Sequence, residues 1–154
     1  MSAFTPKYRK TRQAFIPYVT QAHKDADAID QPERLTGKVR DMAASAAEER
    51  LAAAFQQKGK SFYFRMALGA PRNLPGWKEL DFLVQSTGYA YAIEVDSTFT
   101  HRLKVESDKL HDAIVLKALE QEGYNVFPHV YHLDGETQLS DAKTTRRTVE
   151  ELFV

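Results

Sequence analysis

The segment 89–96, "YAYAIEVD", constrains the fold most, because it has the composition of a buried strand and yet carries two carboxylates. Side chains alternate across a strand, so Glu94 and Asp96 share one face with Ala90 and Ala92. The two tyrosines, the isoleucine and the valine share the other face and suit a core. Carboxylates that close to a core need a cation or a hydrogen-bonding partner. The simpler alternative is a hairpin whose polar face meets water.

The rest of the chain alternates between helical and strand patterns. Glycines at 59 and 123 end two of the predicted helices, and Ser140 is the predicted N-cap of the last. Pro128 lies inside the last predicted strand and indicates a sheet edge or a bulge. The predicted helices are 38–58, 105–122 and 140–152, and the predicted strands are 61–68, 78–85, 89–96 and 124–132. This order predicts an α/β fold with a mixed four-stranded sheet flanked by helices.

The chain has 154 residues, which is enough for one domain with a core of its own. We expect a basic, irregular or partly helical arm over residues 1–36 and an α/β domain over residues 37–154. There is no cysteine, which excludes disulfides and thiolate metal sites and favours a reducing compartment such as the cytoplasm. No apolar run reaches the length of a membrane span, so we expect a soluble protein.

Charge is segregated along the chain although the net charge is zero. Residues 1–24 and 50–78 carry basic side chains and no acid, whereas residues 79–101 carry four acids and no lysine or arginine. Basic blocks of this kind can neutralise phosphates, and a solvated tail and surface is the alternative. The candidate nucleic-acid-binding residues are Lys7, Arg9, Lys10, Arg12, Arg65, Arg72 and Lys78.

A hairpin between segments 78–85 and 89–96 places Asp81 beside Glu94. Alternation puts Asp81 on one face with Leu83, opposite Leu80 and Phe82. Carboxylates that close together raise each other's pKa unless a cation lies between them. Mg²⁺ prefers such oxygen ligands, and Mn²⁺ is expected to substitute for it. The predicted metal ligands are therefore Asp81 and Glu94.

Further candidates come from the elements around this hairpin. Glu48 lies within a predicted apolar helical stripe of Ala44, Leu51, Ala52 and Phe55, where a carboxylate needs a partner. His101 follows the strand of Glu94 and is a candidate proton-transfer group. On the next helix, one polar stripe contains Lys104, Asp108 and His111 or Asp112. Leu110, Ala113, Ile114 and residues 117–119 are expected to form its buried side.

These motifs together resemble the PD-(D/E)XK nuclease superfamily, and within it the very-short-patch-repair endonuclease group. The resemblance spans about residues 44–131 and rests on an ordered set of short motifs. They are Asp81 in "ELDFLV", Glu94 and Asp96 in "AIEVD", His101, Asp108 and "LEQEGYNVF". The sequence departs from the wider superfamily at Asp96, which stands where most members carry a lysine.

The resemblance implies a restriction-endonuclease-like fold and a Mg²⁺-dependent endonuclease that hydrolyses DNA phosphodiesters. It implies that Asp81 and Glu94 bind the metal, that Asp96 completes the shell or orients water, and that His101 assists proton transfer. Lys104 or Lys109 is the candidate for the missing cation. The expected partner is DNA. The chain could act as a monomer or as a homodimer, and the sequence leaves both open.

Two other functions stay open. A non-catalytic nucleic-acid- or protein-binding module on a degenerate nuclease fold is favoured by the missing lysine. A sugar- or nucleotide-processing enzyme on an unrelated fold is weaker, because the sequence has no glycine-rich phosphate loop.

Overall fold

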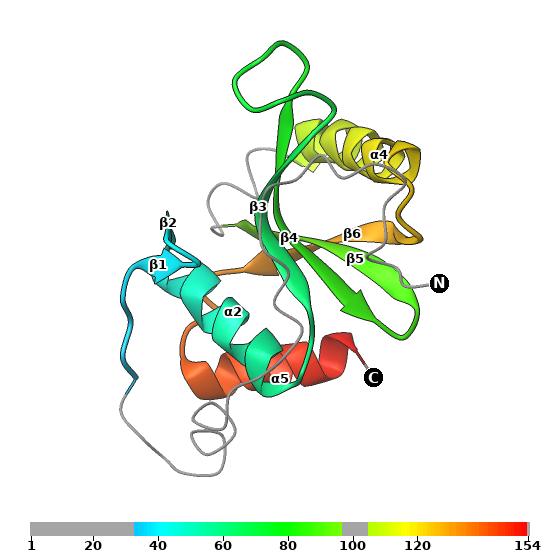
Figure 1. Cartoon of the computed structure of the whole chain (residues 1–154). Coiled ribbons are helices and arrows are strands. Elements are labelled where there is room, and N and C mark those ends of the chain that lie inside the picture. Colours follow the sequence, from blue (N-terminus) through cyan, green and yellow to red (C-terminus); the bar gives the residue numbers. More distant parts are fainter. Residues whose placement is uncertain (1–32, 97–104, 154) are drawn as a thin grey trace.

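The computed structural model of the chain describes residues 33–96 and 105–153 (Figure 1). The predicted arm therefore lies outside the described residues except for its last four positions. The described elements are β1 (Lys38–Val39), β2 (Met42–Ala43), α2 (Ala46–Gln57), β3 (Phe62–Leu68), β4 (Lys78–Ser86), β5 (Tyr89–Asp96), α4 (Val105–Gln121), β6 (Val126–Asp134) and α5 (Ala142–Leu152).

The main sheet has four strands in the order β3-β4-β5-β6. Its first three strands are antiparallel neighbours, and β6 pairs with β5 in parallel. The turn between β4 and β5 is the two-residue loop Thr87-Gly88, with φ values of 50° and 85°. Positive φ at both positions is typical of the tight hairpin turn that matches strand twist. The predicted hairpin and the mixed, helix-flanked sheet are both confirmed.

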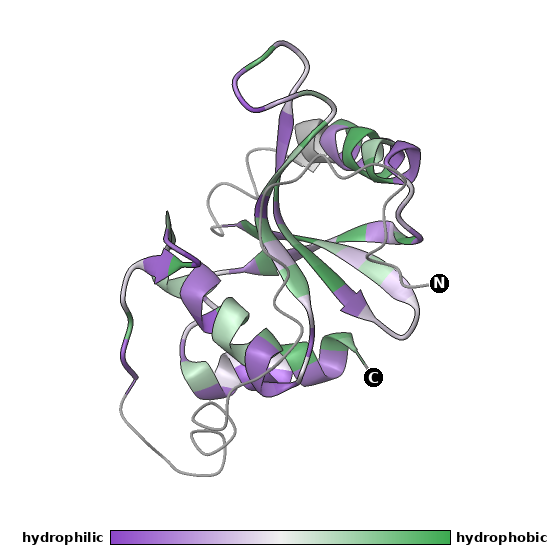
Figure 2. Ribbon diagram, in the orientation of Figure 1, coloured by the Kyte–Doolittle hydropathy of each residue, from purple (hydrophilic) through white to green (hydrophobic). Residues whose placement is uncertain are grey.

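Helices cover both faces of the sheet, so the domain has two hydrophobic clusters (Figure 1). Val115 and Leu119 of α4 pack on one face with Leu83 of β4. On the other face, α2 and α5 cover a cluster rich in phenylalanine. The hydropathy colouring shows apolar residues running along the central strands between these layers (Figure 2). The sheet therefore separates two environments, and a residue's face decides which helices it meets.

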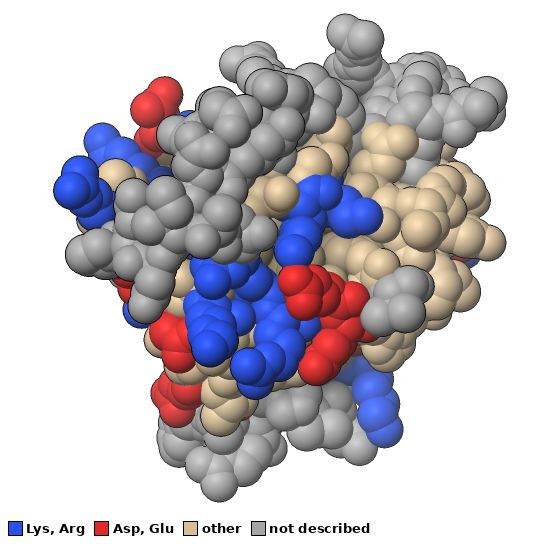
Figure 3. All heavy atoms as spheres, turned by 90° about the horizontal axis from the view of Figure 1, so that it is seen from below, with Lys and Arg blue, Asp and Glu red and all other residues tan. Residues whose placement is uncertain are grey.

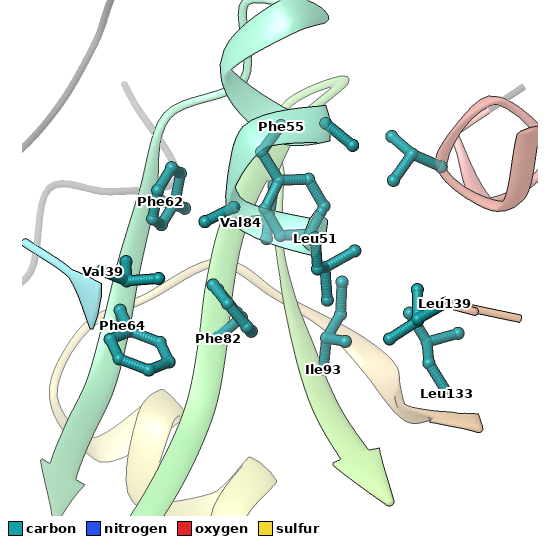
Figure 4. Close-up of a cluster of buried hydrophobic side chains, with 13 residues drawn as sticks. Val39, Leu51, Phe55, Phe62, Phe64, Phe82, Val84, Ile93, Leu133 and Leu139 are labelled. Atoms are coloured by element: carbon teal, nitrogen blue, oxygen red, sulfur yellow. The ribbon is translucent and has the colours of Figure 1, made fainter. Parts of the chain in front are cut away.

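Four phenylalanines form the centre of the cluster under α2 (Figure 4). Phe82 lies between the others, with its ring centroid 5.4 Å from Phe55, 5.7 Å from Phe62 and 5.0 Å from Phe64. Each of the four is fully buried. These rings fix α2 against β3 and β4.

Helix α2 begins at Ala46, so the predicted helix over 38–58 is wrong in its first turns. Ser45 and Glu48 form a capping box, which starts the helix there. Upstream, Arg40 and Asp41 adopt φ values of 49° and 69° in the turn between β1 and β2. The alanine content favoured a longer helix, but the local capping chemistry and this small hairpin set the boundary.

The last strand and helix also differ at their ends from the prediction. Strand β6 is an edge strand, and its register with β5 shifts between Ala90 and Ala92, which confirms the edge and bulge indicated by Pro128. The strand continues to Asp134 rather than ending at 132. Asp141, and not Ser140, caps α5, because its side chain accepts the N–H of Thr144 at 2.7 Å.

None of the helices in residues 33–96 and 105–153 is long and apolar enough to cross a membrane.

We expect Phe82→Ala to lower the free energy of unfolding by about 3–5 kcal/mol, because the surrounding rings cannot collapse into the cavity. Chemical denaturation followed by circular dichroism measures this loss. Leu110→Ala is the control, since Leu110 is 66% exposed and its truncation should cost less than about 0.5 kcal/mol. Equal losses in the two variants would contradict the packing described for Phe82.

Candidate active site

The predicted acids meet where β4, β5 and β6 pass beneath α4. Glu94 and Asp96 lie on β5, and the parallel register places Glu94 opposite His132 of β6. Above them, α4 brings His111 and Asp112 to the same face of the sheet. Side chains from four elements therefore converge on one polar site at the edge of a hydrophobic cluster.

Asp81 lies where the β4–β5 ladder stops. Backbone pairing runs from Ser86–Tyr89 to Phe82–Ile93, and Asp81 is the next residue along β4. Its Oδ2 accepts the backbone N–H of Val95 at 2.8 Å. The side chain thus supplies an acceptor for a part-buried backbone donor beyond the last backbone pair. This bond holds the Asp81 carboxylate against β5, next to Glu94.

Strict alternation fails at this point of the sheet. Leu80 packs with Leu83 under α4, whereas Phe82 packs on the opposite face, so the predicted grouping of Leu80 with Phe82 is wrong. Facing Asp81 across the ladder, Arg65 of β3 has φ 52°, outside the strand region. The backbone changes direction at Asp81 and Arg65, so the side chains before and after this point lie on opposite faces of the sheet. Leu80 and Met66 therefore face α4, whereas Phe82 and Phe64 face α2.

Asp81 and Glu94 form a carboxylate pair, in which Glu94 is buried and Asp81 is half-buried. Burial, then the charge of Glu94 and a hydrogen bond to it, raise the pKa of Asp81 from its ordinary 3.8 to about 9. Burial is also the main reason that the pKa of Glu94 rises from 4.5 to about 7, and the charge of Asp96 raises it further. Glu94 is only 8% exposed. Near neutral pH the pair holds on to a proton, because two unscreened carboxylates repel each other.

His132 connects the third acid to α4. Its Nδ1 lies 2.7 Å from Asp96 Oδ2, and its Nε2 lies 2.7 Å from Asp112 Oδ2. The hydrogen bond to Asp96 is the largest cause that raises the pKa of His132 from 6.5 to about 9, and the bond to Asp112 adds to it against the effect of burial. The imidazolium therefore donates from both nitrogens and ties β5, β6 and α4 together.

The orientation of α4 differs from the prediction. Leu110 and Ile114 are 66% and 41% exposed, although they were expected on the buried side. His111 instead points to the sheet, with its Nε2 3.4 Å from Glu94 Oε1. Val115 and Leu119 form the buried stripe together with Ala118. The helix presents His111 and Asp112 to the acids, where both find partners.

Glu48 has a structural contact within the described residues. Its Oε1 accepts the N–H of Ser45 at 2.9 Å, which completes the capping box of α2. The predicted stripe of Leu51, Ala52 and Phe55 is buried, but Glu48 is only half-buried beside it. The charge of Glu48 is a minor cause of the raised pKa of Asp81. Glu48 therefore adds to the negative potential of the site from its border.

Two of the predicted DNA-binding arginines bind a carboxylate of the chain itself. Arg65 Nε lies 3.1 Å from Glu79 Oε1, and Arg72 forms an ion pair with the other oxygen of Glu79. The Arg72 guanidinium also lies 5.4 Å from the ring centroid of Trp77. Both arginine side chains keep about 40% of their surface exposed, at 38% and 41%. Lys78 is half-buried at the start of β4.

Several predicted residues lie outside the described residues. They are Lys7, Arg9, Lys10 and Arg12 of the arm, and His101 and Lys104 after β5. The side chain of Asp108 falls in the same category, whereas Lys109 is described and exposed on α4. The structure places no lysine of residues 33–96 or 109–153 in contact with Glu94, and histidines occupy that position instead.

The sequence interpretation missed His132 and the joint role of His111 and Asp112. The segment "YHLD" at 131–134 has a period-two pattern with polar residues at 132 and 134, which continues the strand past His132. This alternation could have indicated that His132 lies on the same face as the acids of the "IEVD" segment in β5. The pairing register itself, Glu94 with His132, is a tertiary fact.

No family model, curated protein or solved structure matches this chain. The site is therefore interpreted from its own geometry. Across the described ranges, no three or more His, Asp or Glu side chains are arranged as ligands of one metal ion. The Asp81–Glu94 pair supplies two carboxylates, while His132 occupies the oxygens of Asp96 and Asp112 that point to it.

The free energy of unfolding should fall as the pH rises from about 4 to about 9. Asp81, Glu94 and His132 all have a higher pKa in the folded chain than their ordinary values, so the folded state binds more protons over this range. Their stabilisation is complete at low pH and is lost as the pH passes each folded pKa. Asp81→Asn removes the largest of these shifts and should flatten the dependence.

Denaturant titrations at pH 5, 7 and 9 measure this slope. Glu120→Gln on α4 is the matched control, because Glu120 is an exposed carboxylate and its neutralisation should leave the slope unchanged. A wild-type protein that becomes more stable between pH 5 and pH 9, in the absence of divalent cations, would contradict the buried proton.

Proposed function

We propose that the protein is a Mg²⁺-dependent DNA endonuclease with a restriction-endonuclease-like fold. The observation that carries this proposal is the Asp81–Glu94 pair, in which each pKa is raised by burial and by a neighbouring carboxylate. Groups perturbed in this way cluster at functional sites. The order of elements and the motifs around Asp81, Glu94 and Asp96 support the same reaction.

The residues fit Mg²⁺ better than a metal with many protein ligands. Mg²⁺ is held by one or two carboxylates and keeps several waters, and the pair offers two carboxylates that otherwise retain a proton. When bound, the ion supplies an activated water and neutralises charge on the phosphoryl group. Mn²⁺ has similar ligand preferences and should substitute for it.

The side chains around the pair have separate roles in this proposal. Asp81 and Glu94 hold the ion, and the Val95 N–H keeps Asp81 in place. His132 supplies the positive charge on this face of the sheet and orients Asp96. His111, 3.4 Å from Glu94, and His101 of the adjoining segment are the candidates for proton transfer. Glu48 increases the attraction of the site for a cation.

DNA contacts are assigned to the basic residues that keep exposed surface. Arg65 and Arg72 share Glu79, so the two guanidiniums leave a net positive charge for the backbone of DNA. Lys78 and the arm residues add further cations. A homodimer on DNA is an alternative to a monomer, and the cleavage pattern of the two strands would report it.

A non-catalytic binding module on the same fold is the second candidate. One observation favours it: the His132 imidazole lies 2.7 Å from Asp96, so a side chain of the protein itself pairs with this carboxylate. The two candidates differ in whether Mg²⁺ or Mn²⁺ binds and supports cleavage of DNA.

Divalent cations should bind the carboxylate pair and support DNA cleavage. Mg²⁺ or Mn²⁺ should raise the melting temperature at pH 8 and cut plasmid, branched, mismatched or single-stranded DNA, whereas EDTA should stop the cutting. Asp81→Asn and Glu94→Gln change the volume little and should each abolish both effects. Glu120→Gln should keep both. Metal binding without cleavage on any substrate would favour the binding module, and cleavage by Asp81→Asn would end the assignment.

The proton-transfer group should be identified by a pair of histidine variants. Replacing the correct histidine, in His101→Ala or His111→Ala, should slow cleavage by roughly 10²–10⁴-fold and leave the metal-induced shift in melting temperature in place. The pH–rate profile of the slowed variant should lose one limb. Full activity in both variants would exclude both histidines from the chemistry.

A further inference from the structure

A row of aromatic rings lies on the face of the sheet opposite the carboxylate pair. Tyr89 and Tyr91 come from β5, and Phe127, His129 and Tyr131 come from β6. Tyr91 and Phe127 are stacked with centroids 4.9 Å apart, and Tyr89 meets Phe127 edge-on at 5.6 Å. Phe127 lies 6.1 Å from Tyr131, which meets His129 at 4.7 Å. We call these five residues the aromatic row.

The aromatic row begins where the helical cover ends. Phe153, directly after α5, packs on Tyr91 with centroids 5.1 Å apart. Beyond this contact Tyr89 is 40% exposed, His129 is exposed, and Phe127 and Tyr131 are half-buried. Seen from the side of α2 and α5, uncharged surface extends next to a group that contains both basic and acidic side chains (Figure 3). Four of the five rings of the aromatic row therefore keep exposed surface, whereas Tyr91 is buried beneath Phe153.

The edge of β6 is unsuited to the addition of another strand. Pro128 lacks an N–H to donate, and the register shift between Ala90 and Ala92 places extra residues of β6 at this point. A peptide or a second copy that extended the sheet would meet both obstacles. The accessible feature is therefore the side-chain surface of the rings rather than the backbone edge.

The chemistry at the border of the aromatic row matches a nucleic acid. The Lys60 ammonium lies 5.3 Å from the centroid of Phe153 and 2.8 Å from Ser86 Oγ, which places a cation beside the rings. On α5, Glu150 is neutralised by Lys58 at 2.6 Å. Aromatic rings with a flanking cation bind single strands by base stacking and phosphate neutralisation.

We propose that the aromatic row binds the unpaired bases of single-stranded nucleic acid, with Lys60 near a phosphate. Tyr89 and His129 are the outermost stacking surfaces. This site is separate from the carboxylate pair and lies on the other face of β5, so binding needs neither a metal ion nor cleavage.

Fluorescence anisotropy in EDTA tests the proposal with three labelled probes of about 12 nucleotides. They are oligothymidylate, an abasic strand of equal charge, and a duplex. The wild-type protein should bind oligothymidylate well above the abasic strand. Tyr89→Ala and His129→Ala should each weaken oligothymidylate binding by roughly 5- to 100-fold and leave duplex binding unchanged.

The control variants separate stacking from folding and from catalysis. Tyr89→Phe keeps the ring and should keep the affinity, whereas Leu110→Ala removes exposed apolar surface on α4 and should change nothing. Asp81→Asn should bind oligothymidylate like the wild type in EDTA, whether or not the wild-type protein cleaves DNA. Melting temperatures check that each variant is folded.

Three results would overturn the proposal. The first is equal affinity for oligothymidylate and the abasic strand, or no affinity for either. The second is unchanged binding in both Tyr89→Ala and His129→Ala. The third is a wild-type dimer in sedimentation that dissociates in Tyr89→Ala, which would make the aromatic row an interface between two copies of the chain.

Discussion

The hydrogen bond from the Val95 N–H to Asp81 is the contact on which the arrangement of the site depends. It lies one residue past the last backbone pair between β4 and β5, at Phe82–Ile93. The N–H is partly shielded from water, and leaving it without an acceptor would cost free energy, so an oxygen at this position stabilises the fold. Asp81 does so, and the same contact brings its carboxylate to Glu94. The position of Asp81 therefore both gives the Val95 N–H an acceptor and brings two carboxylates together.

The charge that gathers there is balanced by histidines and retained protons. His132 lies between Asp96 and Asp112, and His111 approaches Glu94 from the same helix. A permanently charged lysine in this position would neutralise the acids at every pH, whereas imidazoles and shared protons make the balance depend on pH. The proposed role of Mg²⁺ follows, since a divalent cation would replace the proton of the Asp81–Glu94 pair.

The two faces of β5 have different chemistry because they face different layers. The face under α4 carries the acids at the end of an apolar cluster, and the face under α2 and α5 continues from the phenylalanine cluster into the aromatic row. Alternation along one strand thus gives β5 a face with carboxylates and a face with aromatic rings. The proposed nuclease site and the proposed single-strand site therefore lie on opposite faces of the same eight-residue strand.

The sequence by itself determined the order of the main helices and strands after the small β1–β2 hairpin, the β4–β5 hairpin and the meeting of Asp81 with Glu94. These depend on local signals: period-two alternation, the Thr87-Gly88 turn and glycines after helices. The sequence misjudged the start of α2, because a high alanine content resembles a longer helix until the capping box of Ser45 and Glu48 is considered. Composition alone cannot decide where α2 begins, because residues 38–45 are compatible both with a helix and with the small β1–β2 hairpin.

Only the tertiary structure decided which side of α4 faces the acids and which histidine joins them. Leu110 and Ile114 are apolar yet exposed, because partners on β5 and β6 hold His111 and Asp112 against the sheet. The register of β6 against β5, which sets His132 opposite Glu94, joins segments that are 38 residues apart in the sequence. The exchange of faces at Asp81 and Arg65 likewise arises from pairing between strands. Such long-range pairings are fixed by the packing of the whole sheet, and no local pattern specifies them.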